Sequence, residues 1–347
     1  MVSPTQRLPP KQRFRWRHSR KLCIALALLV LLLGIFASLI YGAADIPLSS
    51  ILTAFTRFDG STQHLIILTM RLPRLLTATL VGASLAVAGA LMQGLTQNPL
   101  AEPGILGIES GAALAVVIVI FGFGISSSTL ITFVALFGAL VAALTVYFLG
   151  SLGPGGATPL NITVAGAALT AMLSSITAGV LILSDRALEE IRFWLAGSLA
   201  GRDFNLFLTV MPWMVVGLLT AFALGRQLNA LSLGEAIAQS LGQRTARVKV
   251  IITITVVILA GTSVALAGPI GFIGLVMPHI SRGIVGLDYR IVLPFSALLG
   301  ASMLVWADLG ARWILRPQEI PVGIIMSLLG TPFLLYLVRR RMNRKQQ

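Results

Sequence analysis

The polar residues that could do chemistry in this chain are few and mostly basic. Charged residues make up 11% of the 347 residues, hydrophobic residues make up 56%, and the formal net charge is +14. The three histidines, at positions 18, 64 and 279, are scattered, and the single cysteine is Cys23. Metal sites need several such ligands close together, and the sequence contains no G-x-x-x-x-G-K-[ST] motif. We therefore expect neither a metal centre nor ATP binding through a P-loop.

Two arginines, Arg71 and Arg74, stand at the start of a long apolar segment. Residues three apart lie on one face of a helix, and Pro73 between them is tolerated in a first helical turn. Two guanidinium groups on one face can bind acidic side chains. The alternative interpretation is that they reach out of an apolar layer to its polar border. Arg312 follows Asp308 by one helical turn and can simply pair with it.

The elements that must position these residues are apolar helices. The segment 70–107 contains about twenty consecutive small or aliphatic residues, enough to cross a bilayer. A soluble helix needs only one apolar stripe, and the many Gly and Ala residues here allow helices to pack closely in lipid. The sequence predicts an all-α polytopic membrane protein with ten transmembrane helices. Their expected ranges are 22–40, 72–96, 104–125, 130–149, 162–183, 207–224, 248–267, 270–285, 291–309 and 322–338.

Basic residues gather at both ends of the chain, in a head at 1–21 and a tail at 339–347. The positive-inside rule places both ends in the cytoplasm, which requires an even number of spans. The head is similar to the basic region of a signal peptide, but the apolar run 22–40 is too long and lacks a clear cleavage site. We therefore predict a retained first helix, a transmembrane domain at 22–338 and two cytoplasmic tails. No basic run has the interleaved aromatic residues of a nucleic-acid platform.

Three segments depart from plain transmembrane helices. The eighth span is short and contains Pro269, Gly271, Gly274 and Pro278, so we expect it to be broken and surrounded by protein or a water-filled cavity. The outer connection 184–205 is half apolar and half charged, which predicts an amphipathic helix. The inner connection 225–249 is long enough for two short helices broken at Gly234 and Gly242.

Eight motifs between about residue 65 and the C-terminus carry a family resemblance through their order and spacing. They are RLPR (71–74), LVGASLAVAG (80–89), QNPLAEPGILG (97–107), LSLGE (231–235), ALAGPIGFIGLVMPHISR (265–282), LPFSALLGAS (293–302), ADLGAR (307–312) and IPVGIIMSLLGTPFLLYL (320–337). Together they resemble the FecCD-type permeases, the membrane subunits of type II ABC importers for iron–siderophore complexes, haem or cobalamin.

The resemblance implies an assembly in the cytoplasmic membrane of a bacterium. It implies two permease subunits around a central pathway, as a homodimer or a heterodimer, with two cytoplasmic ATPase subunits and an extracytoplasmic substrate-binding protein. ATP and Mg²⁺ would be bound by the ATPase subunits, and this chain would carry no cofactor and catalyse no reaction itself. The sequence does not identify the cargo. An iron(III)–siderophore complex is the expectation, with cobalamin and haem as the alternatives.

The resemblance also implies roles for individual residues. Arg71, Arg74 and Arg312 would dock the two lobes of the binding protein. The segment 225–249 would couple to the ATPase, although its glycine follows the glutamate by seven residues, one more than in the common family pattern. The implied coupling residues are Leu233, Gly234, Glu235, Ala236 and Gly242, with His279 and Arg282 as possible further contacts.

Two loops match the family's cytoplasmic gates. One carries Asn98 and Leu100, and the other is Thr158-Pro159-Leu160, where Pro and Leu replace the small hydroxyl residues of some relatives. Polar residues of the fifth and tenth helices would face the pathway, although a hydroxyl in a membrane helix is often satisfied by its own backbone. The candidates are Thr163, Ser174, Ser175 and Thr177 in the fifth helix and Met326, Ser327 and Thr331 in the tenth.

Glu109 is an acid just inside the third span, where a carboxylate is a candidate functional residue. The alternative interpretation is that it lies at the helix end with slight burial. An ion-coupled secondary transporter is the rival function, but that class usually uses paired buried acids or ion sites in broken helices. Only Glu109 and Asp308 lie within or beside spans, and the sequence suggests no acidic partner for either.

Overall fold

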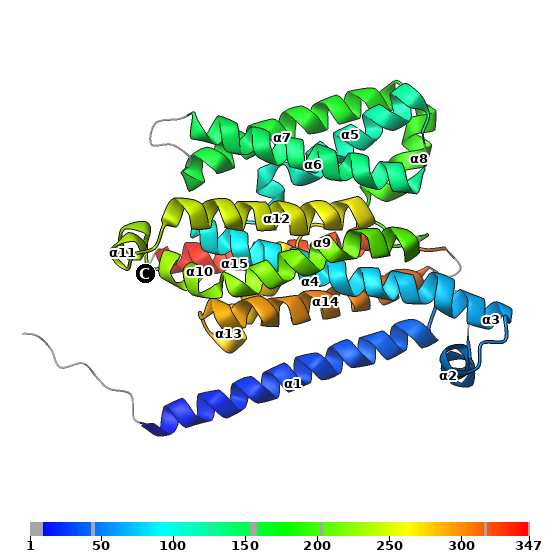
Figure 1. The fold of residues 1–347 in the computed structure, drawn as a ribbon, viewed down its shortest axis with the longest axis horizontal. Coiled ribbons are helices and arrows are strands. Elements are labelled where there is room, and N and C mark those ends of the chain that lie inside the picture. Colours follow the sequence, from blue (N-terminus) through cyan, green and yellow to red (C-terminus); the bar gives the residue numbers. More distant parts are fainter. Residues whose placement is uncertain are drawn as a thin grey trace, which may run out of the picture.

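The computed structural model describes residues 10–42, 46–125, 127–152, 158–201, 204–315 and 318–345, and all regular secondary structure there is helical (Figure 1). Seven helices are long and apolar enough to cross a membrane, and three shorter apolar helices bring the total to the ten predicted spans. They are α1 (Pro10–Ile40), α4 (Leu72–Thr96), α5 (Ile108–Phe123), α6 (Ser128–Ser151), α7 (Pro159–Ile182), α9 (Phe204–Ala223), α12 (Thr245–Ala267), α13 (Ile273–Val285), α14 (Tyr289–Ile314) and α15 (Val322–Lys345).

The shorter elements gather at the two ends of the bundle. At one end lie α10 (Gly225–Leu231) and α11 (Glu235–Ser240), together with the start of α1 and the end of α15 (Figure 1). At the other end lie α2 (Leu48–Thr56), α3 (Thr62–Leu65) and the amphipathic helix α8 (Asp185–Leu195). Both ends of the described chain therefore lie on the side of the segment 225–249, as the even number of spans requires.

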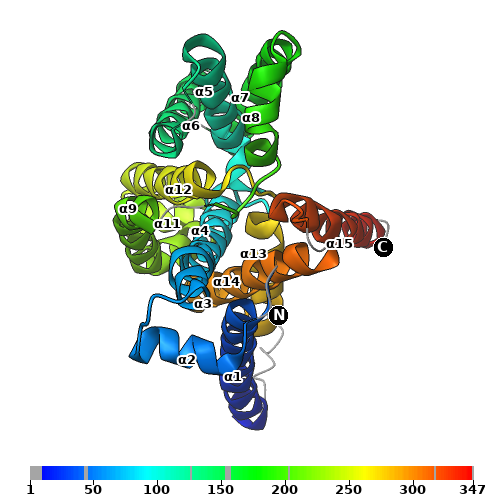
Figure 2. The ribbon, with the colours of Figure 1, turned by 90° about the vertical axis from the view of Figure 1, so that its right-hand side faces the viewer.

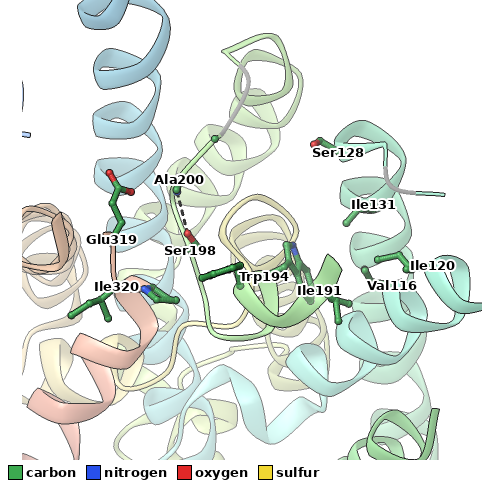
Figure 3. Close-up of a pocket in the computed structure, with 13 residues that line it drawn as sticks. Val116, Ile120, Ser128, Ile131, Ile191, Trp194, Ser198, Ala200, Glu319 and Ile320 are labelled. Atoms are coloured by element: carbon green, nitrogen blue, oxygen red, sulfur yellow. Dashed lines mark hydrogen bonds between the residues drawn. The ribbon is translucent and has the colours of Figure 1, made fainter. Parts of the chain in front are cut away.

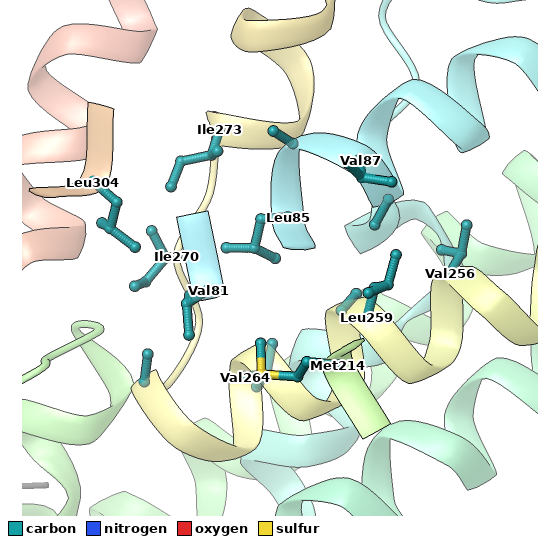
Figure 4. Packing of buried hydrophobic residues seen from close by; sticks show 14 of the residues in the cluster. Val81, Leu85, Val87, Met214, Val256, Leu259, Val264, Ile270, Ile273 and Leu304 are labelled. Carbon is teal, nitrogen blue, oxygen red and sulfur yellow. The ribbon is translucent and has the colours of Figure 1, made fainter. Parts of the chain in front are cut away.

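Helix α4 is the centre of the bundle and packs against α14, α12, α13 and α9. Its glycines permit backbone contact: a Cβ added to Gly82 would overlap the backbone of Gly300, and one added to Gly89 would overlap the backbone of Gly274. Aliphatic side chains fill the remaining space between α4 and α12, including Val81 and Leu85 of α4 (Figure 4). The close packing expected from the small residues is confirmed.

Helices α5, α6, α7 and α8 form a second group beside this bundle (Figure 2). It joins the bundle mainly where α12 packs on α6 and α5. The outer faces of α1 and α6 expose large apolar side chains, among them Leu22, Phe36, Phe137 and Phe148. Such faces suit contact with lipid tails.

Two segments are irregular inside the bundle. Helix α13 has 13 residues, a length of about 20 Å at 1.5 Å per residue, which is less than the ~30 Å hydrocarbon core of a bilayer. The expected broken eighth span is confirmed, and residues 268–272 before it are not helical. The third span begins later than predicted. Residues 97–102 are not helical, a 3₁₀ turn covers Pro103–Leu106, and Gly107 adopts φ +69° before α5 begins.

Candidate functional site

The three arginines of interest lie at the α2–α3 end of the bundle, but their guanidinium groups face inward. Arg71 ends a π-helical segment (Ile66–Arg71) and is 6% exposed. It donates hydrogen bonds to the carbonyl oxygens of Leu39 and Ile40, the latter at 2.8 Å. These carbonyls belong to the last turn of α1, whose C-terminal carbonyls lack helical partners. Arg71 therefore anchors the end of α1.

Arg74 and Arg312 share one buried carboxylate, that of Asp308. Arg74 Nη2 lies 2.8 Å from Asp308 Oδ1, and Arg312 Nε lies 3.2 Å from Asp308 Oδ2. Arg312 also donates to Ser38 Oγ at 2.6 Å, at the end of α1. Arg74 Nη1 reaches a second carboxylate, Glu319 Oε2, at 2.7 Å. The pairing of Arg312 with Asp308, one alternative from the sequence, is present.

The exposure of these side chains differs in a way that matters for docking. The side chain of Arg74 is 13% exposed and that of its partner Glu319 is 31% exposed, whereas the side chains of Arg312 and Asp308 are 4% and 1% exposed. Only the Arg74–Glu319 pair therefore reaches the surface. An acidic partner could approach Arg74 only by competing with Glu319, whereas Arg71 and Arg312 are covered by the end of α1.

A cavity of about 530 Å³ lies at this end, beside Glu319. Figure 3 shows Glu319 and Ile320 on one side, Val116, Ile120 and Ile131 of α5 and α6 on the other, and Trp194 of α8 between them. Its lining is mainly apolar. The sequence did not identify Glu319 or Trp194, because nothing in their local pattern distinguishes them from other residues of the outer connections.

The segment 225–249 forms the two short helices predicted from its glycines. Gly234, which precedes α11, has φ +110°, and Gly242, which follows α11, has φ +82°. Leu233, Ile237 and Leu241 are 60%, 49% and 67% exposed and stand four residues apart. An apolar face of this kind at the end of the molecule marks an interaction surface. Ala236 and Gly242 are exposed beside it, and the remaining predicted coupling residue, Glu235, is also exposed.

Polar contacts fix this segment to the bundle. Glu235 forms an ion pair with Lys249 at 2.7 Å, and the hydrogen bond from Lys249 lowers the pKa of Glu235. Asn229 of α10 donates to Asp288 Oδ1 at 2.7 Å and accepts from the backbone N–H of Tyr289 at 2.8 Å. Hydrogen bonds from Arg290 and Asn229 hold the pKa of Asp288 well below its usual value. The Asn229–Asp288 contact joins positions 59 residues apart, which no local pattern could reveal.

The two predicted gate loops lie close to the segment 225–249. Asn98 Oδ1 accepts from the backbone N–H of Leu100 at 3.1 Å, and Thr158 caps α7 by accepting from the N–H of Asn161 at 3.2 Å. Pro159 is the first residue of α7, and Leu160 is 71% exposed. A cavity of about 330 Å³ is lined by residues of both regions: Thr96, Thr158, Pro159, Glu235 and Lys249.

His279 and Arg282 face neighbouring helices. The ring of His279 lies edge-on to that of Phe333 in α15, with 5.9 Å between centroids. Arg282 donates to Gln93 Oε1, and Gln93 Nε2 donates to the carbonyls of Gly274 and Leu275 at 3.1 and 3.3 Å. Gln93 thus joins α4 to both ends of α13, a role that the sequence did not indicate.

The predicted pathway residues divide into two groups. Ser174 and Ser175 of α7 and Ser327 and Thr331 of α15 are exposed on the described chain. Thr177 is 7% exposed and donates to the carbonyl of Leu173, and Met326 is 1% exposed, so these two face the interior instead. Thr163 is half-buried and bonds to its own helix. The exposed face of α7 also carries small residues (Ala167, Ala171, Ala178, Gly179) together with large apolar ones such as Met172 and Ile182.

Glu109 has an acidic neighbour that the sequence did not suggest. A Cβ added to Gly104 would lie 3.8 Å from Glu102 Oε1 and 3.9 Å from Glu109 Cδ, so both carboxylates border the same glycine. Both residues are partly buried. Within the described residues, no group of three or more His, Cys, Asp or Glu side chains could hold a metal ion.

Comparisons with known proteins agree on one family. Residues 29–340 match the FecCD transport family. The Fe(3+)-citrate import system permease protein YfmD of Bacillus subtilis (strain 168) is 43% identical over 95% of this chain and 98% of its own length. The ferric enterobactin transport system permease protein FepD of Escherichia coli (strain K12) is 42% identical over 93% of this chain and 96% of its own length.

Two further comparisons extend this result. The cobalamin import system permease protein BtuC of Halobacterium salinarum is 39% identical over 81% of this chain and 75% of its own length. A solved structure described as a metal-chelate type ABC transporter in an inward-facing conformation aligns with a TM-score of 0.81 and 30% identity, covering 92% of this chain and 99% of that chain.

Proposed function

This chain belongs to the FecCD transport family, and on that premise we propose that it forms half of the pathway by which an ABC importer carries an iron(III)–siderophore complex across a bacterial cytoplasmic membrane. A second permease subunit supplies the other half. Two ATPase subunits bind the cytoplasmic side, and a substrate-binding protein delivers the cargo outside. The family match over residues 29–340 is the observation that carries this proposal.

The orientation follows from charge and position. The basic segments at both ends of the chain favour the cytoplasm, and the start of α1 and the end of α15 lie at the same end of the bundle as α10 and α11 (Figure 1). The exposed apolar side chains Leu233, Ile237 and Leu241 then face the cytoplasm, where they can insert into a cleft of an ATPase subunit. The Arg74–Glu319 pair faces outward, toward the binding protein.

Coupling between ATPase and gate uses the shared cytoplasmic cavity. Glu235, the first residue of α11, and Lys249, in α12, line one part of it, and Thr158 and Pro159, where α7 begins, line another. Displacement of α11 by a closing ATPase changes the shape of this cavity and moves the gate loop against it. Hydrolysis itself takes place in the ATPase subunits.

The cargo follows from relatives and from the character of the pathway. The names of two relatives specify ferric citrate and ferric enterobactin. The exposed polar side chains proposed to line the pathway are hydroxyls of α7 and α15, which are weak ligands for a metal. Weak ligands suit the passage of an intact chelate, since strong ones would trap it. The cobalamin permease among the relatives keeps cobalamin as the second candidate cargo.

Uptake by the reconstituted complex tests this function. Proteoliposomes would contain the full chain with the permease and ATPase subunits that co-purify with it, and the binding protein would be added outside. We expect uptake of radioactive iron(III) as its citrate or enterobactin complex to require ATP and the binding protein and to survive ionophores. Uptake driven by an ion gradient without nucleotide would establish the secondary transporter instead.

A further inference from the structure

Phe272 has a backbone conformation that is unusual for a bulky residue. Its φ is +70° and its ψ is −25°, in the left-handed region that side chains other than those of Asn and Asp rarely adopt. Gln97 is the only other non-glycine residue with positive φ in the described part of the chain. Such strain persists only where the surrounding structure enforces it, and it is concentrated at functional positions.

Two contacts hold Phe272 in this conformation. Its ring fills a notch at Gly330 of α15, where an added Cβ would overlap the Cβ and Cγ atoms of Phe272. The carboxylate of Glu102 lies next to its backbone N–H. Its own carbonyl accepts from Val276 N at 2.8 Å, which starts the first turn of α13. One residue therefore joins the segment between α4 and α5, the start of α13 and the middle of α15.

The helices on the two sides of this contact are held differently. The start of α13 is fixed to α4 by the backbone contact between Gly89 and Gly274 and by the two hydrogen bonds from Gln93. Helix α15 packs on α14 and α13, and its start is held by a hydrogen bond from Gly323 N–H to the carbonyl of Gly197 at 3.0 Å. Beyond that start it exposes Leu328 and Leu329 next to Gly330, so this part of α15 is less enclosed than the start of α13.

We propose that Phe272 is a positioning residue for transport: its ring holds α15 against α13 in the conformation described here and leaves the Gly330 notch when α15 moves. This inference rests on the proposed function, in which Ser327 and Thr331 of α15 line the pathway. Glu102 extends the link, because it lies in the segment that carries the gate residues Asn98 and Leu100. Movement of that segment takes the Glu102 carboxylate away from Phe272 N–H and so weakens the hold on α15.

The test measures coupling in the reconstituted complex. Phe272→Gly removes the ring and relieves the backbone strain. We expect ATP hydrolysis without binding protein to rise about threefold or more and the uptake of radioactive ferric enterobactin per ATP to fall about tenfold. If Phe272→Gly fails to assemble, Phe272→Asn should give the same result, because it removes the ring and introduces a residue that tolerates the left-handed region. The inference is overturned if an assembled variant takes up as much ferric enterobactin per ATP as the wild type does.

A second pair of variants tests the notch directly. Gly330→Ala adds a methyl group where the ring lies and should reduce uptake per ATP about tenfold. Because the methyl group occupies the space vacated by the ring, Gly330→Ala should have little further effect in a Phe272→Gly background. Gly310→Ala in α14 is the matched control, since nothing lies within 4 Å of its Cβ position. Equal activity of Gly330→Ala and Gly310→Ala, or fully additive effects in the double variant, would contradict a role for the notch.

The wild-type complex separates this inference from the proposed function. If it takes up iron without ATP or binding protein, the proposed function fails, and with it the premise of the inference. If it requires both while the Phe272 variants remain fully coupled, the inference alone fails.

Discussion

Arg74 and Glu319 form an ion pair of 2.7 Å between the start of α4 and the connection that leads into α15. The same guanidinium group bridges to the buried Asp308. Glu319 also lines the outer cavity beside α8 (Figure 3). The most accessible of the three arginines proposed to dock the binding protein is therefore already paired with a carboxylate of the same chain.

The first prediction concerns Glu319→Gln, which leaves Arg74 with one carboxylate partner fewer. If acidic side chains of the binding protein compete with Glu319, its affinity for the complex should rise by up to about fivefold, since a partly exposed ion pair contributes about 0.2–1 kcal/mol. Surface plasmon resonance with the immobilised complex would measure the dissociation constant. Glu189→Gln, on the exposed face of α8, is the control and should leave it unchanged. A weaker affinity for Glu319→Gln would assign Glu319 itself to the contact.

The second prediction concerns Asp308→Asn. This change leaves Arg74 and Arg312 next to each other without the buried carboxylate that both contact. Removing one partner of a buried ion pair costs about 3–5 kcal/mol, so the melting temperature of the purified chain in detergent should fall by several degrees. Asp185→Asn is the matched control, because Asp185 is exposed at the start of α8. Equal melting temperatures for the two variants would show that the network does not stabilise the fold.

The spans and the arginine network differ in how far the sequence predicts them. Composition and periodicity are local, and they were sufficient for the ten spans, α8 and the helix pair at α10 and α11. The burial of Arg71 depends on α1, because Arg71 donates to the carbonyl oxygens of Leu39 and Ile40, which lie 32 and 31 positions earlier in the chain. The family resemblance implies a docking role for all three arginines, whereas the burial of Arg71 and Arg312 against α1 is a tertiary effect that no local pattern shows.

The sequence predicts the local structure of the candidate site better than it predicts the contacts between its residues. The glycines of 225–249 predicted a break between two helices because positive φ favours glycine, and Gly234 and Gly242 have that conformation. The partners Asn229–Asp288, Gln93–Arg282 and Glu102–Phe272 each join separate elements, so no spacing in the sequence predicts them. Thr177 was placed with the pathway residues because of its hydroxyl, but the helix satisfies that hydroxyl with its own backbone.

The third prediction addresses the coupling surface. Ile237→Ala and Leu241→Ala together remove two exposed apolar side chains without touching the buried Ala238. Truncating a buried interface side chain costs about 1–2 kcal/mol or more, so the ATPase subunits should co-purify at least tenfold less well while the chain keeps its melting temperature. Leu29→Ala on the exposed face of α1 should change neither. Normal co-purification of the double variant would place the ATPase contact elsewhere.

The fourth prediction is a pH dependence at Asp288. Its pKa is lowered in the fold by Arg290 and Asn229. The ionised carboxylate therefore stabilises the fold at pH values above 3.8, the usual pKa of this group. That stabilisation decreases as pH falls below 3.8 and is lost only when the pH passes the lowered pKa. Asp288→Asn keeps an oxygen that can cap α14 but removes the negative charge that pairs with Arg290, so it should lower the stability of the fold at neutral pH.

The melting temperatures of the wild type and of Asp288→Asn in detergent would show this dependence. The difference should be constant between about pH 7 and pH 5, because Asp288 is ionised in both the folded and unfolded states there. It should then shrink as the pH falls below about 4, since the unfolded state takes up a proton first and the wild type loses its advantage. Asp185→Asn provides the comparison for an exposed aspartate, with a small difference throughout. A difference in melting temperature that grew toward low pH would contradict the role of the ionised carboxylate. A group whose pKa is lowered by folding contributes less stability as the pH falls.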